Sequence, residues 1–383
     1  MKRIAILGST GSIGQNTLGV IRNFPDRFKV VALSTNGNVK IIRQQIREFS
    51  PQFVCVRDKE AALNLKSKIK SSQVKLLAGE EGLEALVREK QIDKVVLAIS
   101  GSAALLPLLN AIDSGKDVAL ANKEALVMAG PIIVRQARTK KTMIIPVDSE
   151  QSAIWQCLDG EDKSKLKNIY LTASGGPFRN APKKDFKNIS VKRVLRHPTW
   201  KMGRKISVDS ATMMNKGLEV LETMFLFDVG VEKIKVVIHP ESIIHSMVEF
   251  IDGVVIAQLS ATDMRIPIQY ALSYPQRLPS GLTSMDFYKL GKLNFEKPQF
   301  SRFPCLGLAY RVAGEGGAAP CALNAANEVC VEEFLNKRLD FISIPKVIEK
   351  VLGKHKNIGN PDLNDILATD SWARQEAQRI IHN

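Results

Sequence analysis

Residues 3–14 decide the fold class of this chain: Arg-Ile-Ala-Ile-Leu-Gly-Ser-Thr-Gly-Ser-Ile-Gly. The apolar run Arg3–Leu7 predicts a strand, Gly8–Gly14 predicts a tight turn, and the apolar spacing over Asn16–Ile21 predicts a helix. A strand, a glycine turn and a helix in this order form a dinucleotide-binding unit, because the glycines let the backbone approach a pyrophosphate and the helix N-terminus offers free N–H groups. The spacing G-x-x-G-x-x-G is a variant of the usual fingerprint, and a plain tight turn is the alternative.

Short β-rich runs and amphipathic segments alternate after this unit. The alternation predicts a mostly parallel, doubly wound sheet, so we expect an α/β fold with a Rossmann-type domain over residues 1–147. The predicted strands are Lys29–Leu33, Phe53–Val56, Val74–Leu77, Val95–Ile99 and Val118–Leu120, with helical segments such as Ala61–Ile69 and Leu83–Glu89 between them.

The end of the second predicted strand bears on the choice of cofactor. An NAD site usually places Asp or Glu there, where the carboxylate binds the ribose 2′-hydroxyl. This strand ends instead in Ser34-Thr35-Asn36-Gly37-Asn38, and Lys40, Arg43 and Arg57 follow it. We expect NADPH rather than NADH, because the 2′-phosphate would repel a carboxylate and attract cations. A surface loop with incidental basic residues is the alternative.

Two further strand ends carry small and polar residues. These are Ala98-Ile99-Ser100-Gly101, and Ala121-Asn122-Lys123-Glu124, which follows a strand and opens a helix. The second should therefore lie at the carboxyl edge of the sheet, where ligands of such folds bind. Its alternative interpretation is a helix cap and first turn.

Two carboxylates stand two positions apart in Val147-Asp148-Ser149-Glu150-Gln151. If Met143–Val147 is a strand, Asp148 and Glu150 leave its end on the same side, since strand side chains repeat with a period of two. Such a pair can hold a divalent cation through hard oxygen ligands, or act as a general acid and base. The alternative is a helix start with Asp148 or Ser149 as the N-cap.

A second polar cluster lies farther along the chain. Ser210, Asn215 and Lys216 supply the hydroxyl, amide and ammonium groups that bind phosphate. Glu219 follows Lys216 by three positions and Asn215 by four, so these residues can share one helix face. Glu219 would also add a third carboxylate to the pair described above and complete a metal site. A surface polar residue or a helix cap is the alternative for each of these residues taken singly.

The stretch between these clusters is rich in Gly, Pro, Lys and Arg. We expect a lid over Lys183–Gly203, since long irregular loops often cover binding sites. Trp200 and Met202 would cover a bound ligand, although simple packing of Trp200 onto the body is the alternative.

The rest of the chain gives the domain organisation. Ser246–Phe250 and Val254–Leu259 predict an antiparallel hairpin, in a sheet whose apolar outer positions suit dimerisation. His239 and His245 are expected to be packed rather than to bind ligands. We expect a catalytic, metal-binding and dimerisation domain over 148–289, a linker over 290–303 and a C-terminal helical domain over 304–383. The helices of this last domain are predicted at Leu306–Ala313, Ala319–Asn336, Ile344–Lys354 and Asn364–Ile381.

Composition restricts the partners and the compartment. The formal charge is +15, but the basic residues are spread over the whole length, which favours an anionic small ligand over nucleic acid. No apolar run approaches the roughly 18 residues that a transmembrane helix needs, so we expect no membrane partner. Five scattered cysteines without a C-x-x-C motif suggest reduced thiols and a cytoplasmic location.

Together these residues resemble the 1-deoxy-D-xylulose 5-phosphate reductoisomerases, NADPH-dependent enzymes of the non-mevalonate isoprenoid pathway. The resemblance covers essentially the whole chain. Its most specific pieces are Gly8–Gly14, Ala121–Glu124, Val147–Gln151, Thr172–Phe178, His197–Gly203 and Ser207–Glu219.

The resemblance implies a homodimer that binds NADPH and one Mg²⁺ or Mn²⁺ ion per active site. It implies metal ligands at Asp148, Glu150 and Glu219, with Lys123 and His197 completing the catalytic set. It implies cofactor contacts at Thr10, Gly11, Ser12, Ile13, Asn38, Asn122, Glu124 and Gly203, to which we add Asn36 and Gly37. It implies substrate contacts at Lys123, Ser149, Glu150, Ser174, His197, Trp200, Ser210, Asn215, Lys216 and Glu219.

The chain departs from the family pattern after the second strand. Many members have Gly-Lys-Asn where this chain has Asn36-Gly37-Asn38, so the lysine that could meet the 2′-phosphate is missing. Another Rossmann-type dehydrogenase, such as an aspartate-semialdehyde or homoserine dehydrogenase, is one alternative function. A non-enzymatic nucleotide sensor is the other, but it has no use for three metal carboxylates.

Overall fold

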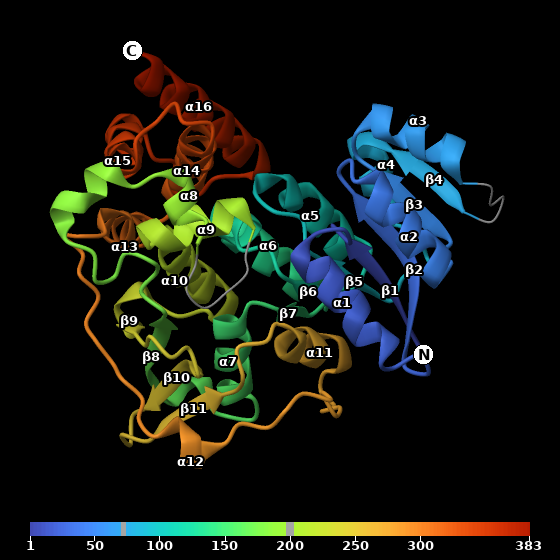
Figure 1. Cartoon of the computed structure of the whole chain (residues 1–383), viewed down its shortest axis with the longest axis horizontal. Coiled ribbons are helices and arrows are strands. Elements are labelled where there is room, and N and C mark those ends of the chain that lie inside the picture. The colour runs from blue at the N-terminus through green and yellow to red at the C-terminus, as the bar shows by residue number, and fades with distance from the viewer. Residues whose placement is uncertain (70–73, 197–202) are drawn as a thin grey trace. The chain divides into compact units, whose positions relative to one another are not determined.

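The computed structural model describes residues 1–69, 74–196 and 203–383, which fall into two compact units (Figure 1). Unit 1 consists of Met1–Ala125, Ile133–Ser152 and Asp263–Leu282. Unit 2 consists of Leu126–Ile132, Ala153–Thr262 and Thr283–Asn383. Our division of the sequence into four segments places its boundaries elsewhere and stays a prediction.

Unit 1 is built on a seven-stranded parallel sheet with the strand order β4-β3-β2-β1-β5-β6-β7. Residues Ile4–Leu7 of β1 are completely buried, as expected of a central strand covered on both faces. The strands are β1 (Lys2–Leu7), β2 (Phe28–Thr35), β3 (Phe53–Val56), β4 (Lys75–Ala78), β5 (Lys94–Leu97), β6 (Asp117–Leu120) and β7 (Ile144–Pro146).

Helices connect these strands and cover both faces of the sheet. The strand order runs outward from β1 to β4 and then restarts at β5 on the other side of β1, so right-handed crossovers place the two sets of helices on opposite faces. The predicted doubly wound fold is confirmed. The helices are α1 (Ser12–Arg22), α2 (Val39–Phe49), α3 (Lys59–Lys68), α4 (Gly79–Val87), α5 (Leu105–Asp113), α6 (Glu124–Lys140) and α7 (Ser149–Leu158). Parts of α6 and α7 belong to unit 2.

A helix from far along the chain completes unit 1. This helix, α11 (Arg265–Ser273), packs against α1. The ammonium group of Lys94, at the start of β5, donates to the carbonyl oxygen of Ala271 at 2.9 Å. Lys94 is buried, and this burial lowers its pKa to about 8.

Unit 2 contains a four-stranded mixed sheet with the order β11-β10-β8-β9. Its strands are β8 (Leu166–Ala173), β9 (Ile234–Ile238), β10 (Ile244–Phe250) and β11 (Val255–Leu259). β10 and β11 form the predicted antiparallel hairpin, and β10 also pairs antiparallel with β8. β8 and β9 are parallel. The strand order leaves β11 and β9 at the two edges of the sheet.

The helices of unit 2 share one hydrophobic core with this sheet. The core includes Leu166 on β8, Val351 on α15 and Ala373 on α16, and α10 packs on α13. All four predicted C-terminal helices are present. The helices are α8 (Val191–Val194), α9 (Arg204–Thr212), α10 (Met214–Phe227), α12 (Phe287–Leu290), α13 (Pro304–Glu315), α14 (Ala319–Leu335), α15 (Ile344–Lys354) and α16 (Leu363–His382).

One local expectation was wrong, and a second holds with shorter bounds. The stretch before Arg204 is not wholly irregular, because it contains α8 and the short 3-10 helix η3 (Lys183–Asn188). The strand predicted over Met143–Val147 ends at Pro146, and α7 begins at Ser149. Over the described ranges, no helix combines the length and the apolarity that crossing a lipid bilayer requires.

Candidate active site

Gly8 and Gly14 fix the turn between β1 and α1. Gly8 has a φ of +86°, and a Cβ atom on it would lie 2.5 Å from the carbonyl oxygen of Ala98. A Cβ on Gly14 would lie 2.4 Å from the Cα of Ser9. Gly11 is exposed, and a Cβ on it would meet only the carbonyl oxygen of Gly8, at 3.4 Å. The fold therefore requires Gly8 and Gly14, whereas Gly11 leaves open the space in front of the helix.

The N-terminus of α1 has the character of an anion site. Among the described residues no side chain caps this helix, so its first N–H groups stay available for a ligand. Ser12 is exposed in the first turn and Ile13 is half-buried. The hydroxyl of Thr10 is hydrogen-bonded to that of Thr35 at 2.7 Å, which joins the turn to the end of β2.

The loop after β2 presents no acid to a cofactor. Asn36, Gly37 and Asn38 are exposed, and Asn38 caps α2 by accepting from the N–H of Ile41 at 3.1 Å. The cations proposed to meet a 2′-phosphate differ in their placement. Arg57 is ion-paired with Glu80.

Arg43 and Lys40, the other two cations, also differ from each other. Arg43 lines a cavity together with Lys29 and Gln52, which lie at the amino-terminal ends of β2 and β3. Arg43 is therefore turned away from the cofactor edge, while Lys40 is exposed on the first turn of α2.

Asn122 ties together the carboxyl ends of β5 and β6. Its Nδ2 donates to the carbonyl oxygens of Ile99 and Gly101 at 2.9 and 3.0 Å, and to Oε2 of Glu124 at 2.8 Å. Its Oδ1 accepts from the N–H of Ala125 at 2.8 Å, which caps α6. The expected position at the carboxyl edge is confirmed, and the same residues also form the helix cap that was the alternative.

Asp148 and Glu150 reach this edge by a different route from the one predicted. The period-two argument is wrong, because the chain is already helical at Glu150. The N–H of Ser149 donates to Oδ1 of Asp148 at 3.1 Å, and the hydroxyl of Ser149 donates to Glu150. Lys123, at the end of the neighbouring strand β6, places its Nζ 2.6 Å from Oδ2 of Asp148. Two carboxylates and one ammonium group thus gather at one end of the sheet.

In unit 2, a double-glycine turn places Ser174 beside α9. Gly175 and Gly176 have φ values of +84° and +71°, and a Cβ on Gly176 would lie 2.5 Å from the carbonyl oxygen of Ser210. The N–H of Gly176 donates to the hydroxyl of Ser174 at 3.4 Å. The turn after β8 therefore lies directly against the end of α9, which carries Ser210.

A helix break places Asn215 and Lys216 at a helix N-terminus. Met213 has a φ of +62°, so α9 ends there and α10 begins at the next residue. Asn215 and Lys216 lie in the first turn of α10, where helix N–H groups and an ammonium group together suit a phosphate. Both side chains donate to the buried carboxylate of Glu219, which confirms that these three residues share one helix face.

His239 and His245 are packed, as expected. His239 is completely buried, its Nε2 accepts from the N–H of Ile243 at 3.2 Å, and its Nδ1 lies 2.9 Å from the carbonyl oxygen of Asn294. His245 is also buried, with its Nε2 3.3 Å from the carbonyl oxygen of Ser260.

Family models cover most of the chain. Models described as 1-deoxy-D-xylulose 5-phosphate reductoisomerase and as its C-terminal domain match residues 4–130 and 144–227, and one described as DXP reductoisomerase C-terminal domain matches 259–376. A curated 1-deoxy-D-xylulose 5-phosphate reductoisomerase from Caldanaerobacter subterraneus subsp. tengcongensis is 51% identical over 380 residues, which cover 99% of each chain. The chain belongs to the 1-deoxy-D-xylulose 5-phosphate reductoisomerase family.

Solved reductoisomerase structures match along the full length. The enzyme from Zymomonas mobilis in complex with NADPH is 40% identical, with a TM-score of 0.92 over 100% of this chain and 99% of that one. A DOX-P reductoisomerase in complex with NADPH, fosmidomycin and magnesium is also 40% identical, with a TM-score of 0.95 over 100% of this chain and 98% of that one.

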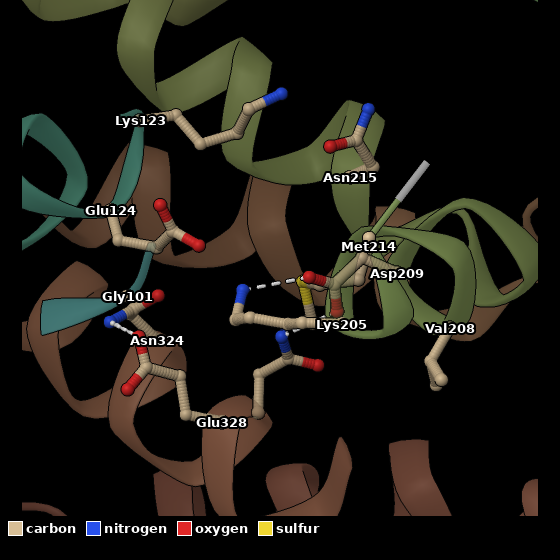
Figure 2. A network of polar contacts seen from close by, with 12 residues as sticks. Gly101, Lys123, Glu124, Lys205, Val208, Asp209, Met214, Asn215, Asn324 and Glu328 are labelled. Carbon is tan, nitrogen blue, oxygen red and sulfur yellow. Dashed lines mark hydrogen bonds and ion pairs between the residues drawn. The ribbon is translucent and has the colours of Figure 1, made fainter. Parts of the chain in front are cut away.

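A buried polar network, which sequence reasoning missed, supports the reductoisomerase helix that carries Ser210. Asp209 on α9 accepts from Lys205 at 2.8 Å (Figure 2). It also accepts from Nδ2 of Asn327 on α14, at 2.8 Å. Asp209 and Asn327 are almost completely buried, so α9 is fixed to the C-terminal helices by charged and amide groups. The asparagines at 324 and 327, which interrupt the apolar first half of α14, are a sequence signal of this network.

Part of the predicted reductoisomerase site lies outside the described residues. His197, Trp200 and Met202 belong to that part. Gly203 is described, and it is the exposed residue immediately before α9.

Proposed function

We propose that this chain converts 1-deoxy-D-xylulose 5-phosphate to 2-C-methyl-D-erythritol 4-phosphate in non-mevalonate isoprenoid biosynthesis. It would act as an NADPH-dependent oxidoreductase that requires a divalent cation. Membership of the reductoisomerase family over essentially the full length carries this conclusion. The solved family structures in complex with NADPH, fosmidomycin and magnesium support the cofactor and the metal.

Unit 1 would hold NADPH at the carboxyl edge of its sheet. The pyrophosphate would lie across Gly11 and the uncapped N-terminus of α1. The residues that join the strand ends, Asn122 and Glu124, would line the nicotinamide side. When bound, NADPH supplies the hydride that reduces the aldehyde formed by rearrangement of the substrate.

Three carboxylates would hold the cation: Asp148, Glu150 and Glu219. The donor set fits Mg²⁺ or Mn²⁺, since carboxylate oxygens are hard ligands. A cation there would polarise the substrate ketone and stabilise negative charge on its oxygen.

Binding of a cation would change the ion-pair partners of two lysines. In the structure, Lys123 is paired with Asp148 and Lys216 with Glu219. A divalent cation on the carboxylates would free both ammonium groups for the substrate. Lys123 would then face the reacting oxygen atoms and Lys216 the phosphate.

The phosphate would bind in unit 2 at the N-terminus of α10. Ser174, Ser210, Asn215 and Lys216 would contact it, because the Gly175–Gly176 turn brings the hydroxyl-bearing segments together there. The segment Lys183–Gly203, with His197, Trp200 and Met202, is proposed as the lid that closes over the substrate and excludes water.

The test is NADPH oxidation by purified protein with 1-deoxy-D-xylulose 5-phosphate and Mg²⁺, followed by absorbance. The reaction should stop when a chelator is added and resume when Mg²⁺ is restored. The rate should be far lower with NADH.

Each alternative has its own outcome. Equal rates with NADH would keep the reaction and overturn the cofactor preference. A folded protein that binds NADPH without turning over this substrate would point to another dehydrogenase or to a nucleotide sensor.

We further propose a homodimer that forms through the β10–β11 hairpin. β11 is an edge strand, and Ile251, Val254 and Val255 of this hairpin are 64%, 52% and 48% exposed. Exposed apolar side chains on an edge strand favour association with a second chain. Light scattering should give the dimer mass, and Val255→Lys should shift the protein toward the monomer.

We propose that the protein works in the cytoplasm. All five cysteines are free and buried, as expected of thiols kept in a reducing compartment. Measuring the reaction in soluble and membrane fractions of the source cells would test this.

A further inference from the structure

Unit 2 contains a cavity of about 530 Å³ that none of the residues proposed to contact the metal, the cofactor or the substrate lines. Its wall is formed by η3, by Thr212 at the end of α9, by the segment 301–305 that opens α13, and by the segment 341–349 that leads into α15. A volume of this size suits a small organic ligand.

The cavity is separate from the predicted phosphate site. Thr212 and Ser210 are two residues apart on α9, so their side chains point about 200° apart around the helix axis. Ser210 lies beside the Gly175–Gly176 turn, whereas Thr212 lines the cavity. An occupant would therefore lie behind α9 with respect to Ser210.

One wall of the cavity is aromatic. The ring centroid of Phe186 lies 5.8 Å from that of Phe303 and 6.0 Å from that of Phe341. Ile342 and Pro345 extend this apolar surface and are only half-buried. The wall offers ring faces and edges to the apolar part of a ligand.

The rim of the cavity is cationic. Lys184, Lys187, Arg302 and Lys346 contribute positive charges, against the single carboxylate of Glu349. Lys184, Lys187 and Lys346 are exposed, and within the described part of the chain none of them makes an ion pair. The rim thus carries uncompensated positive charge next to apolar rings.

Arg302 contributes to both the aromatic wall and the cationic rim of the cavity. Its guanidinium carbon lies 5.5 Å from the ring centroid of Phe186 and 5.9 Å from that of Phe303. Its Nη1 donates to Oε1 of Gln299 at 3.3 Å. Its Nε is buried and has no hydrogen-bond partner among the described residues. This N–H is closed to solvent, so a ligand in the cavity would meet the rest of the guanidinium group, whose positive charge would attract an anionic group.

We propose that this cavity binds a small amphipathic anion, an aromatic or branched hydrocarbon that carries a phosphate or carboxylate group. The apolar body packs against Phe186, Phe303 and Phe341. The anionic group pairs with the guanidinium group of Arg302 and is attracted by the lysines of the rim. This binding goes beyond the proposed reaction and does not depend on it.

The test uses the full-length protein and 1-naphthyl phosphate as the probe, with binding followed by calorimetry and by naphthyl fluorescence. Inorganic phosphate and 1-naphthol, tested alone, separate the contributions of the anionic group and of the ring. 1-Naphthoate distinguishes a carboxylate from a phosphate. Wild-type protein should bind the naphthyl anions far more tightly than either inorganic phosphate or 1-naphthol.

Variants place the binding in this cavity. Arg302→Gln should lower the affinity for the probe by about tenfold or more, since it removes a charge-assisted hydrogen bond. Lys346→Gln should weaken it several-fold, whereas Lys350→Gln, an exposed change on the same helix outside the cavity, should leave it unchanged. Ile342→Trp should block the probe by filling the cavity, and serves if Arg302→Gln does not fold.

The proposal is overturned if the wild-type protein does not bind the naphthyl anions, or binds 1-naphthol equally well. Unchanged affinity in folded Arg302→Gln and Ile342→Trp would also overturn it. Because binding is read without turnover, failure of the proposed reaction would not be mistaken for failure of this site.

Discussion

At the scale of single residues, substitution of Glu219 should impair metal-dependent turnover without impairing cofactor binding. It is completely buried in unit 2, whereas the glycine turn proposed for NADPH belongs to unit 1. We expect Glu219→Gln to lower kcat with Mg²⁺ by about 100-fold or more, because it removes one negative charge from the ligand set. NADPH affinity, measured by fluorescence in the absence of substrate, should stay within about twofold of wild type.

A matched control exists for this substitution. Glu232 is an exposed acid on the short 3-10 helix Val231–Lys233, and Glu232→Gln should leave both kcat and NADPH binding unchanged. A well-folded Glu219→Gln protein that no longer binds NADPH would contradict the assignment of Glu219 to the metal.

The residue types of the site could be predicted, but not how the backbone presents them. Asp148 and Glu150 were identified from carboxylate spacing, although the helix start at Ser149 invalidates the strand geometry behind that argument. The link between Asp209 and Asn327 could not be predicted, because the two residues are 118 positions apart and only packing brings them together.

At the scale of secondary-structure elements, two glycines of one turn should respond differently to an added methyl group. Gly14→Ala places a Cβ 2.4 Å from the backbone of Ser9, so we expect a loss of about 1–3 kcal/mol in the free energy of unfolding. Gly11→Ala should unfold at the wild-type temperature, because its φ is −76° and only Gly8 is near. It should nonetheless lower the affinity for NADPH by roughly tenfold, since the methyl group occupies the space through which the pyrophosphate approaches the backbone.

Thermal unfolding and NADPH titration of both variants would check this pair. Equal destabilisation of the two proteins, or unchanged NADPH binding by Gly11→Ala, would contradict the different roles assigned to the two glycines.

The pairing of β10 with β8 should depend on pH through Glu249. Hydrogen bonds from Lys167, Asn168 and Tyr170, at 2.8, 2.7 and 2.7 Å, lower the pKa of this carboxyl to about 2. The pKa of an unfolded glutamate is about 4.3, so the ionised carboxylate stabilises the fold above that pH, and this stabilisation is lost as pH falls toward the folded value.

The melting temperature of Glu249→Gln should therefore be lower than that of wild type at neutral pH. The difference should shrink between about pH 4.3 and the folded pKa. Tyr170→Phe, which removes one of the three donors, should show a smaller difference of the same form. A difference that does not change with pH would contradict this account.

Element types could be predicted where patterns are local. The hairpin of β10 and β11 and the four C-terminal helices follow from local spacing and turn residues. The insertion of β8 between β10 and β9 could not be predicted, because strand order depends on contacts between distant segments.

At the scale of the whole molecule, no thiol should be reactive while the protein is folded. Burial raises the pKa of Cys55 and Cys305 to about 12 and that of Cys157 to about 11, and it also raises those of Cys321 and Cys330. The thiolate is the reactive form, so a disulfide reagent should label none of the five within minutes and all five in denaturant. Rapid labelling of one equivalent in the native protein would contradict this prediction.

The Rossmann-type architecture of the first part of the chain could be predicted because strands and helices alternate there without interruption. The membership of α11 in unit 1 could not, because nothing in Arg265–Ser273 itself indicates that it packs on α1. Our boundary at 289 assigns this helix to the central domain, and only tertiary contacts group it with the N-terminal strands.

Because α11 lies far along the chain, it is translated long after the strands of unit 1. The glycine turn leaves the ribosome first, but the partner of Lys94 is Ala271, and unit 1 extends to Leu282. The nascent cofactor-binding half must therefore wait, with one face of α1 uncovered, while Ala153–Thr262 of unit 2 is translated. For the same reason a gene fragment that stops after β7 would encode an incomplete unit, so this half of the enzyme cannot be exchanged between proteins as one contiguous cassette.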